Sequence, residues 1–328
     1  MPDVTIPCTV CILANNLARL DDNKIVFSNY LRSLGISVFI ADVNTLRYVS
    51  GVFVADGARI EETLTLYDAV GRAETTTLDT FDLLWLFNQP APCFGLDAWS
   101  ILFALNQRVR FVNAIAPMYL ANSKAFLPGI LHDNQLPETV ISHYVDDHVG
   151  AMDTWGRTIL KPPSDGCGNS VFMIAPGDTN AYVIVQSMCG GGSGDHIHNA
   201  AVVGLSKSYA VAQRFLPHET EFRVILAGRT CVGAYKKAKP ETDHRANLSQ
   251  GGQILPYDMS EAEIVRYTPI AERLADMGIN FCGLDVINGR VLEFNLVDPG
   301  GPHLRAELGG DLLCAAIWSA VLREIGHG

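Results

Sequence analysis

The sequence predicts a protein of mixed class, with an N-terminal α/β domain followed by two α+β regions. Three observations lead to this prediction. Strand-like and helix-like stretches alternate through the first third of the chain. In the middle third, apolar stretches of strand length follow one another across short turns. In the last third, two apolar strands flank the dipeptide "NG", which is typical of a tight hairpin.

The first third contains the elements of a doubly wound parallel sheet, and we place this domain at residues 1–115. Apolar runs predict the strands, polar–apolar periodicity predicts the helices, and Gly35 ends the first helix. The strands fall at 9–14, 36–43, 81–87 and 109–114, and the helices at 22–34 and 97–108. The loop "NQPAPCFG" follows the strand at 81–87, where the carboxyl end of a strand would meet a ligand.

The middle third predicts a smaller α+β domain at residues 116–210. A helix comes first, and a loop with two glycines at 165–170 lies between the second and third strands. The helix is predicted at 117–132 and the strands at 139–145, 156–163, 171–175 and 181–188. The stretch 188–200 is rich in glycine and histidine, resembles an insertion, and is expected to be mobile.

The last third predicts a domain of strands and two helices at residues 211–328. Ser260 and Glu263 form a capping box at the start of one helix, and Gly278 ends it. The predicted strands are 209–216, 221–228, 230–238 and the two arms of the hairpin at 283–295. An amphipathic helix at 310–326 closes the chain.

Composition limits the functional classes. The chain has 328 residues and a net charge of −11, so a broad basic surface for nucleic acid or anionic lipid is not expected. No stretch approaches the roughly 18 apolar residues of a membrane span, and the N-terminus lacks the features of a signal peptide. Eight cysteines are scattered through apolar segments, which favours free thiols in a reducing, cytoplasmic compartment.

Two carboxylates interrupt the apolar arms of the hairpin, Asp285 in one and Glu293 in the other. A carboxylate in a buried strand is costly unless a cation neutralises it. The "NG" turn brings the two acids to within about one residue of facing positions, and Asn295 shares a face with Glu293. Three oxygen-bearing side chains on one face suit a hard cation such as Mg²⁺. The alternative is a pair of strand acids bound to Arg290 or Arg305.

A lysine and a glycine-bearing loop predict a phosphate site in the middle third. Lys161 ends an apolar strand, and the loop "SDGCGNS" after it could cradle phosphate with its backbone N–H groups. The alternative is a plain β-turn. Further basic residues lie in or beside the later strands: Arg223, Lys236, Lys237 and Arg245. A solvated sheet edge would explain the lysines, but Arg223 interrupts an apolar run.

The order of these motifs resembles the ATP-grasp superfamily, and bacterial-type glutathione synthetase within it. The resemblance covers almost the whole chain and is strongest over residues 117–310. It is carried by "PMYLANSK", "LPETVIS", "ILKPPSDGCGNSVF", "AQRFLP", "HRANLSQGG" and "GINFCGLDVINGRVLEFNLVDPGG". It implies an ATP-grasp fold, in which two α+β subdomains hold ATP between them after an N-terminal α/β domain.

The resemblance also implies roles for individual residues. Two lysines and the loop 165–170 match the groups that contact the phosphates in the family. Residues 213–216 match the strand that contacts the adenine edge, and Glu221 matches the acid that contacts the ribose. The implied nucleotide-binding set is Lys124, Lys161, Asp165, Gly166, Gly168, Asn169, Ser170, Gln213, Arg214, Phe215, Leu216, Glu221 and Lys237. The implied catalytic residues are Arg223, Lys237, Arg245 and Asn247, and the magnesium ligands are Asp285, Glu293 and Asn295.

The implied reaction is ATP-dependent ligation of a small acid to an amine through an acylphosphate, with two Mg²⁺ ions or Mn²⁺ in their place. Relatives are commonly homodimers or homotetramers, so a homo-oligomer is expected. The charged loop that glutathione synthetase has after its domain-one strand is "FNQPAPCFG" in this chain, and the usual Thr-Ser-Pro-Thr is "VDPGGPH". These differences favour another acid and amine over glutathione synthesis itself. The alternatives are glutathione synthetase, an ATP-binding regulatory protein with little catalysis, and a kinase that stops at phosphoryl transfer.

Overall fold

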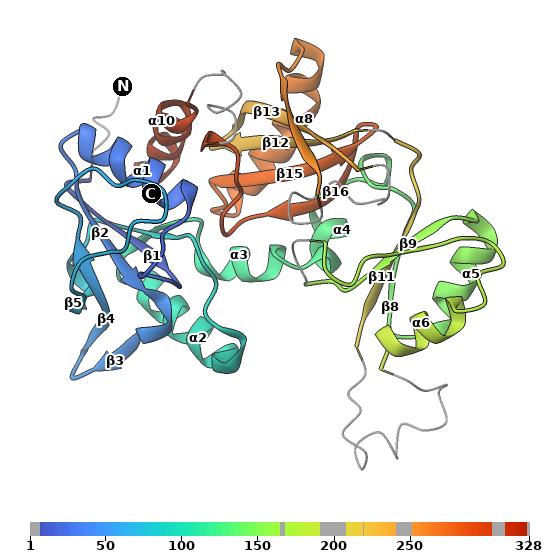
Figure 1. Cartoon of the computed structure of the whole chain (residues 1–328), viewed down its shortest axis with the longest axis horizontal. Helices are drawn as coiled ribbons and strands as arrows, with labels where there is room; N and C mark the ends of the chain where they lie inside the picture. The colour runs from blue at the N-terminus through green and yellow to red at the C-terminus, as the bar shows by residue number, and fades with distance from the viewer. Residues whose placement is uncertain are drawn as a thin grey trace.

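The structure is a computed structural model that describes residues 7–164, 168–190, 208–218, 220–240, 251–303 and 312–326. Its strands form three sheets of seven, four and five strands. Figure 1 shows the first sheet mainly in blue, the second in green and yellow and the third in gold to red, with the third between the other two in this view. Among the described residues no helix is long and apolar enough to cross a membrane.

The first sheet has the order β3-β4-β2-β1-β6-β7, and the seventh strand, β5, pairs with β4. Its strands are β1 (Thr9–Ala14), β2 (Ser37–Asp42), β3 (Arg47–Val49), β4 (Val52–Arg59), β5 (Glu74–Thr77), β6 (Leu83–Leu86) and β7 (Arg110–Val112). The four predicted strands are present and pair in parallel, as expected. Prediction missed the antiparallel strands β3, β4 and β5. The strands β3 and β5 are short and have no apolar run, but β4 begins with the apolar run Val52–Ala55, a signal that prediction overlooked.

Helices cover both faces of the first sheet. The strand β1 is apolar from its second residue to its end because α1 (Asp22–Ser33) and α10 (Cys314–Ile325) pack on one face while α2 (Gly95–Asn106) packs on the other. Val10 and Ile12 belong to the first of these cores and Cys11 to the second. Short 3₁₀ turns at η1 (Val43–Thr45), η2 (Leu78–Thr80) and η3 (Pro92–Phe94) complete this part.

The segment that leads to the second sheet is broken into short turns where one helix at 117–132 was predicted. It consists of α3 (Ile115–Ala121), η4 (Lys124–Phe126), α4 (Leu127–Ile130) and η5 (Asp133–Gln135). The prediction of one continuous helix is wrong because the Ser123 hydroxyl accepts a hydrogen bond from the Ala125 N–H and starts a new turn. Figure 1 shows α3 and α4 passing between the first sheet and the other two.

The second sheet is antiparallel, with the order β10-β9-β11-β8. Its elements are β8 (Thr139–Ser142), α5 (Val145–Trp155), β9 (Thr158–Lys161), β10 (Phe172–Ile174), α6 (Ala181–Met188) and β11 (Ala210–Arg214). Prediction missed α5 and wrongly made 181–188 a strand. Its β-branched residues favour a strand, but α6 packs Val185 against α5 and the sheet, and this tertiary contact overrides the preference. The expected insertion lies mostly outside the described residues.

The third sheet is antiparallel, with the order β14-β13-β12-β15-β16. Its elements are β12 (Thr220–Ala227), β13 (Thr230–Ala238), β14 (Gln253–Tyr257), α8 (Glu261–Asp276), β15 (Phe281–Ile287) and β16 (Arg290–Asn295). The helix α8 packs on one face with Ile270 and Leu274, and α10 packs on the other with Ile317. The predicted capping box at Ser260 and the stop at Gly278 are confirmed. The domain boundaries after residues 115 and 210 stay a prediction.

One buried asparagine joins the first sheet to the third. Asn113 follows β7, is 1% exposed and has a positive φ of 59°. Its amide nitrogen donates to the Phe281 and Leu296 carbonyls at 2.7 and 2.9 Å. Its amide oxygen accepts from the Asn280 and Phe281 N–H groups, both at 2.8 Å. The side chain therefore holds the start of β15 and the residue after β16 against the first sheet.

Replacement of Asn113 should destabilise the protein strongly. Asn113→Ala leaves buried backbone donors and acceptors without partners, and we expect it to lower the free energy of unfolding by at least about 3 kcal/mol. Urea denaturation followed by circular dichroism measures this. Asn180→Ala removes an exposed asparagine and should change the same quantity by less than about 0.5 kcal/mol. Equal midpoints for the two variants would contradict the assigned role of Asn113.

Candidate active site

The hairpin of β15 and β16 places its two acids directly opposite each other. Asn288 and Gly289 form the turn with φ of 49° and 76°, as a two-residue turn of this kind requires. Asp285 pairs with Glu293 in the strand register, and Asn295 pairs with Gly283 two positions along. The predicted hairpin and the shared face of Glu293 and Asn295 are confirmed.

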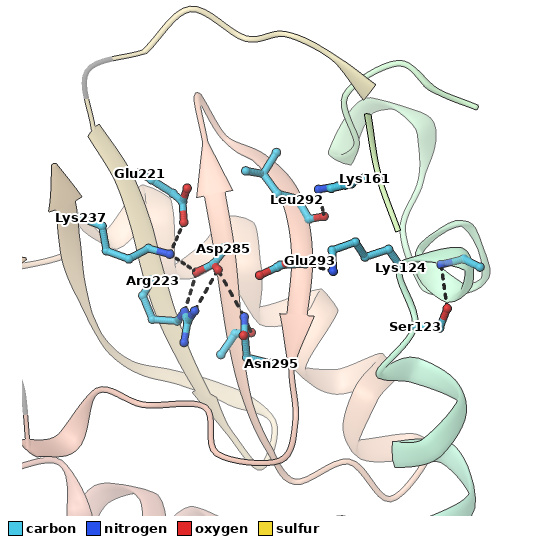
Figure 2. A network of polar contacts seen from close by, with 12 residues as sticks. Ser123, Lys124, Lys161, Glu221, Arg223, Lys237, Asp285, Leu292, Glu293 and Asn295 are labelled. Atoms are coloured by element: carbon cyan, nitrogen blue, oxygen red, sulfur yellow. Dashed lines mark hydrogen bonds and ion pairs between the residues drawn. The ribbon is translucent and has the colours of Figure 1, made fainter. Parts of the chain in front are cut away.

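Asp285 is held by two cations from neighbouring strands. Arg223 on β12 lies opposite Asp285, and its Nε and terminal nitrogen donate to the two carboxylate oxygens at 2.5 and 2.9 Å. The Lys237 Nζ on β13 lies 2.9 Å from Asp285 Oδ1 and also forms an ion pair with Glu221. Figure 2 shows these side chains converging over the sheet. The strand register itself assembles this network, since Glu221 and Lys237 are also directly paired.

Burial sets the electrostatics of this network. Asp285 is 2% exposed, and burial by itself raises the pKa of its carboxyl group. The charges of Arg223 and Lys237 outweigh burial and hold the pKa of Asp285 far below its usual range. Conversely, burial lowers the pKa of Lys237, but Asp285 and Glu221 raise it above its usual value. Asp285 and its two cations are therefore charged in the folded protein.

The second acid is held by a lysine from outside the third sheet. The Lys124 Nζ on η4 lies 3.0 Å from Glu293 Oε2. Lys161, at the end of β9, approaches the same strand and donates to the Leu292 carbonyl at 3.4 Å. Burial lowers the pKa of Lys161 to about 8, although Glu293 opposes this effect. Figure 2 shows both lysines facing β16 from the opposite side to Arg223.

The alternative to a metal site named Arg290 or Arg305 as the partner of the acids, and for Arg290 it is wrong. Arg290 donates to the backbone carbonyls of Asp133 and Leu136 instead of contacting either acid. Arg305 lies outside the described residues. The cations that neutralise the hairpin come from β12, β13 and η4, all distant in sequence.

A first cavity lies between the second and third sheets, and we call it the junction cavity. The described residues that line it are Lys124, Ile159, Lys161, Pro162, Gly168, Asn169, Val171, Gln213, Arg214, Phe215, Leu216, His218, Glu221, Asp285, Ile287, Leu292 and Glu293. Most of the nucleotide-binding residues expected from sequence are therefore brought together, along with two of the three expected metal ligands. Gln213 is 2% exposed and donates to the Thr139 hydroxyl at 3.3 Å.

Some expected site residues do not line the junction cavity. Arg223 and Lys237 lie behind Asp285. Ser170 is in the described loop with a φ of 53° but is absent from the lining. Asp165, Gly166, Arg245 and Asn247 fall outside the described residues. Sequence reasoning missed the apolar lining of Ile159, Ile287 and Leu292, because apolar residues in strands signal a core and not a cavity.

A second cavity adjoins the first, and we call it the neighbouring cavity. Its described lining contains Asn15, Phe87, Asn88, Gln89, Pro90, Ala91, Pro92, Asn122, Lys124, Ser164, Glu293, Phe294, Asn295, Leu296, Val297 and Asp298. It shares Lys124 and Glu293 with the junction cavity. The loop after β6, which the sequence placed beside a ligand, forms one wall. The residues after β16 form another.

The oxygen donors of the hairpin fit magnesium that arrives with phosphate. They are two carboxylates and one amide, and among the described residues no group of three His, Cys, Asp or Glu side chains is placed to hold a metal alone. Asn295 Nδ2 donates to Asp285 Oδ2 at 3.4 Å, and Arg223 and Lys237 occupy the same carboxylate. Mg²⁺ usually takes one or two carboxylates and completes its shell with water and phosphate oxygens, which suits this limited donor set.

Comparison with known proteins gives a consistent result. The model of the prokaryotic glutathione synthetase ATP-grasp domain matches residues 129–304. Glutathione synthetase of Rhodopseudomonas palustris is 25% identical over 293 residues, covering 88% of each chain. The enzyme of Synechocystis sp. is 23% identical over 317 residues, covering 89% of this chain and 92% of that one.

Solved structures share the fold. The D-cycloserine synthetase DcsG superimposes with a TM-score of 0.61 at 14% identity, covering 97% of this chain and 99% of that chain. The ATP-grasp ligase PsnB, solved with a minimal precursor, also gives a TM-score of 0.61 at 14% identity, with 98% and 100% covered. At this identity the likeness establishes the ATP-grasp fold, which confirms the predicted fold class.

Removal of Asp285 should cost more stability than removal of an exposed ion pair. Asp285→Ala leaves Arg223 buried without its anion and leaves Lys237 with Glu221 alone, and we expect a loss of about 3–5 kcal/mol in the free energy of unfolding. Asp276→Ala, whose carboxylate is 64% exposed beside Arg229, should cost less than about 1 kcal/mol. Urea denaturation measures both losses.

A double variant separates charge from packing in the same experiment. Arg223→Met in the Asp285→Ala background removes one unpaired buried cation, so we expect it to recover part of the lost stability. A double variant less stable than Asp285→Ala alone would show that the unpaired charge is not the cause.

Proposed function

The chain belongs to the prokaryotic glutathione synthetase ATP-grasp family, and from this premise we propose that the junction cavity binds ATP and the neighbouring cavity the acid that ATP activates. The protein is an ATP-dependent carboxylate–amine ligase, an enzyme that forms ADP and a C–N bond. One observation carries the assignment of the cavities. The junction cavity is lined by lysines from η4 and β9, by residues of the strand β11 and by both hairpin carboxylates, and a second cavity adjoins it.

We assign the nucleotide by the chemistry of the lining. Lys124, Lys161 and the backbone of Gly168 and Asn169 would receive the phosphates, because cations and N–H groups bind anions. Gln213 to Leu216 would meet the adenine edge, with Ile159, Ile287 and Leu292 as apolar contacts. Glu221 would meet the ribose. Ser170, Asp165 and Gly166 complete the proposed phosphate loop.

We assign magnesium to Asp285, Glu293 and Asn295, with two ions in the complete site. Bound magnesium would neutralise charge on the transferring phosphoryl group. Because Arg223 and Lys237 already hold Asp285, the free protein has little need of a metal cation there. The metal would therefore bind together with the nucleotide, whose phosphates supply the remaining oxygen ligands.

The reaction divides into two displacements. First, an oxygen of the acid's carboxylate attacks the γ-phosphorus of ATP. The bond from phosphorus to the β–γ bridging oxygen breaks, giving an acylphosphate and ADP. Second, the lone pair of a neutral amine attacks the carbonyl carbon, the bond to the phosphate oxygen breaks, and the nitrogen loses a proton to solvent. Lys124 and Lys161 would stabilise negative charge in the first step, and Arg245 and Asn247 in the second.

We further propose a homo-oligomer in the cytoplasm, with small molecules as substrates. The described cysteines are all free, which supports a reducing compartment. Size-exclusion chromatography with light scattering would determine the oligomeric state.

The ligase assignment predicts ADP release that requires both an acid and an amine. The protein is mixed with ATP, Mg²⁺ and panels of acids and amines, and ADP is measured by a coupled assay. The variants Asp285→Asn and Glu293→Gln should reduce the rate at least about 100-fold, because each removes a charge that faces the phosphates. Asp276→Asn is the matched control and should retain full activity.

The outcomes of this panel separate the alternatives. Turnover with γ-glutamylcysteine and glycine would identify glutathione synthetase, the activity named for the relatives. ADP release with an acid alone, and a phosphorylated product, would indicate a kinase. Nucleotide binding without ADP release from any pair would overturn the ligase assignment in favour of a regulatory protein.

Nucleotide affinity should fall as pH rises above about 8. In the free protein Lys161 loses its proton near that pH, but bound phosphate favours the charged lysine, so binding must take up a proton. Calorimetric titration with ADP and Mg²⁺ at several pH values measures the affinity. We expect a constant affinity below about pH 7 and a decline of up to about tenfold per unit above about 8.

Two variants control for other titrating groups. Lys161→Arg keeps its charge at every pH tested and should remove most of the decline. Lys161→Met should bind more weakly at all pH values and also show no decline from this group. The same slope in the wild type and Lys161→Arg would assign the pH dependence to another residue.

A further inference from the structure

Asp298 stands in the wall of the neighbouring cavity in a strained conformation. It follows β16 by three residues, beyond the hairpin's metal-site residues, and its side chain is 28% exposed. Its φ is 143°, a region that residues other than glycine avoid. A carboxylate that persists in such a backbone, in the wall of a cavity, is a candidate for ligand binding.

Among the described residues, the positive charge around Asp298 is incomplete. Lys24 is 2% exposed and lies 2.6 Å from Asp21 but 3.5 Å from Asp298 Oδ2. The Asn23 amide nitrogen donates to the other oxygen of Asp298. One buried lysine thus serves two carboxylates, and it is closer to Asp21. Each oxygen of Asp298 keeps capacity for a further donor. Burial raises the pKa of Asp298, and the charge of Lys24 does not fully oppose this effect.

The rest of the described lining is neutral except at the shared end. Its uncharged polar residues include amides and a hydroxyl, from Asn15, Asn88, Gln89, Asn122 and Ser164. Lys124 and Glu293 mark the end that adjoins the junction cavity. Among the described lining residues Lys124 is the one cation. A ligand in this cavity would therefore meet an anionic group at Asp298 and the proposed phosphoryl-transfer site at Lys124 and Glu293.

We propose that the acid substrate carries an ammonium group and is bound as an amino acid, with that ammonium against Asp298 and its reacting carboxylate toward Lys124 and Glu293. The proposal rests on the ligase function and names its acid substrate class. The ammonium would supply Asp298 with a second cation, because Lys24 is shared between Asp298 and Asp21. The amides in the cavity lining suit a polar side chain. It is a recognition group and not the attacking amine, because an ammonium paired with a carboxylate has no free lone pair.

Matched pairs of acids test the proposal. α- and β-amino acids are compared with the corresponding hydroxy acids and des-amino acids as acid substrates, with ADP release measured across a panel of amines. We expect amino acids to be preferred. In Asp298→Asn the KM for the preferred amino acid should rise about 10- to 100-fold, because the variant removes a charged hydrogen-bond acceptor. The KM for its des-amino analogue should change less than about threefold.

Controls separate recognition from folding. Asn keeps the shape of Asp298 and tolerates positive φ, and thermal denaturation of Asp298→Asn checks that it folds. Asp276→Asn changes net charge equally at an exposed site and should leave the amino acid preference unchanged. Lys24→Met provides a second variant: it removes the internal competitor for Asp298, so the ratio of amino acid to des-amino KM should move in the direction opposite to Asp298→Asn.

The failure of this proposal and that of the ligase function are distinguishable. If acids without an ammonium group turn over as well as amino acids, or Asp298→Asn keeps the wild-type preference, the ligase stands and the proposal is wrong. If no pair releases ADP, the ligase function fails, and the proposal is then tested by calorimetric titration of amino acids and des-amino acids into protein with ADP and Mg²⁺. Preferential amino acid binding that Asp298→Asn abolishes supports the proposal, and equal binding of both classes overturns it.

Discussion

The buried carboxylate of Asp285 is the constraint around which the third sheet and the site are organised. A carboxylate on an interior strand of a sheet requires a cation, and the register of β12, β13 and β15 places Arg223 and Lys237 to supply it. The same register positions Glu221 beside Lys237. Stability and function thus use the same charges. The residues that would organise phosphate and magnesium already neutralise one another in the protein without ligands, so the charge of Asp285 is balanced before ATP arrives.

The sequence predicted elements best where one local signal sufficed. The parallel strands β1, β2, β6 and β7 have apolar runs, α8 has a capping box, and the hairpin has its "NG" turn. It failed where tertiary contacts decide. The β-branched stretch of α6 forms a helix because it packs on α5, and the short strands β3 and β5 form by pairing with β4. The helix expected at 117–132 breaks at Ser123, whose hydroxyl caps the turn that contains Lys124.

The site was predictable in its residue types but not in its contacts. The order of motifs identified lysines, a glycine loop and hairpin acids that the structure gathers in one cavity. Spacing could show that Asp285 and Glu293 face each other, since two strands joined by a short turn have a fixed register. It could not show which cations neutralise them, because Arg223, Lys237 and Lys124 come from segments between 48 and 169 residues away. Asp298 carried no signal beyond a departure from the family's usual loop.

The four hydrogen bonds of Asn113 have a mechanical consequence. They fasten the first sheet to the start of β15 and to the residue after β16, and we call these joined parts the frame. The second sheet is attached to this frame through the broken segment around Lys124. Opening and closing over ATP would then be a movement of the second sheet relative to the frame. The wall that contains Asp298 belongs to the frame, so the recognition site for the acid would keep its shape while the entrance for the nucleotide widens and narrows.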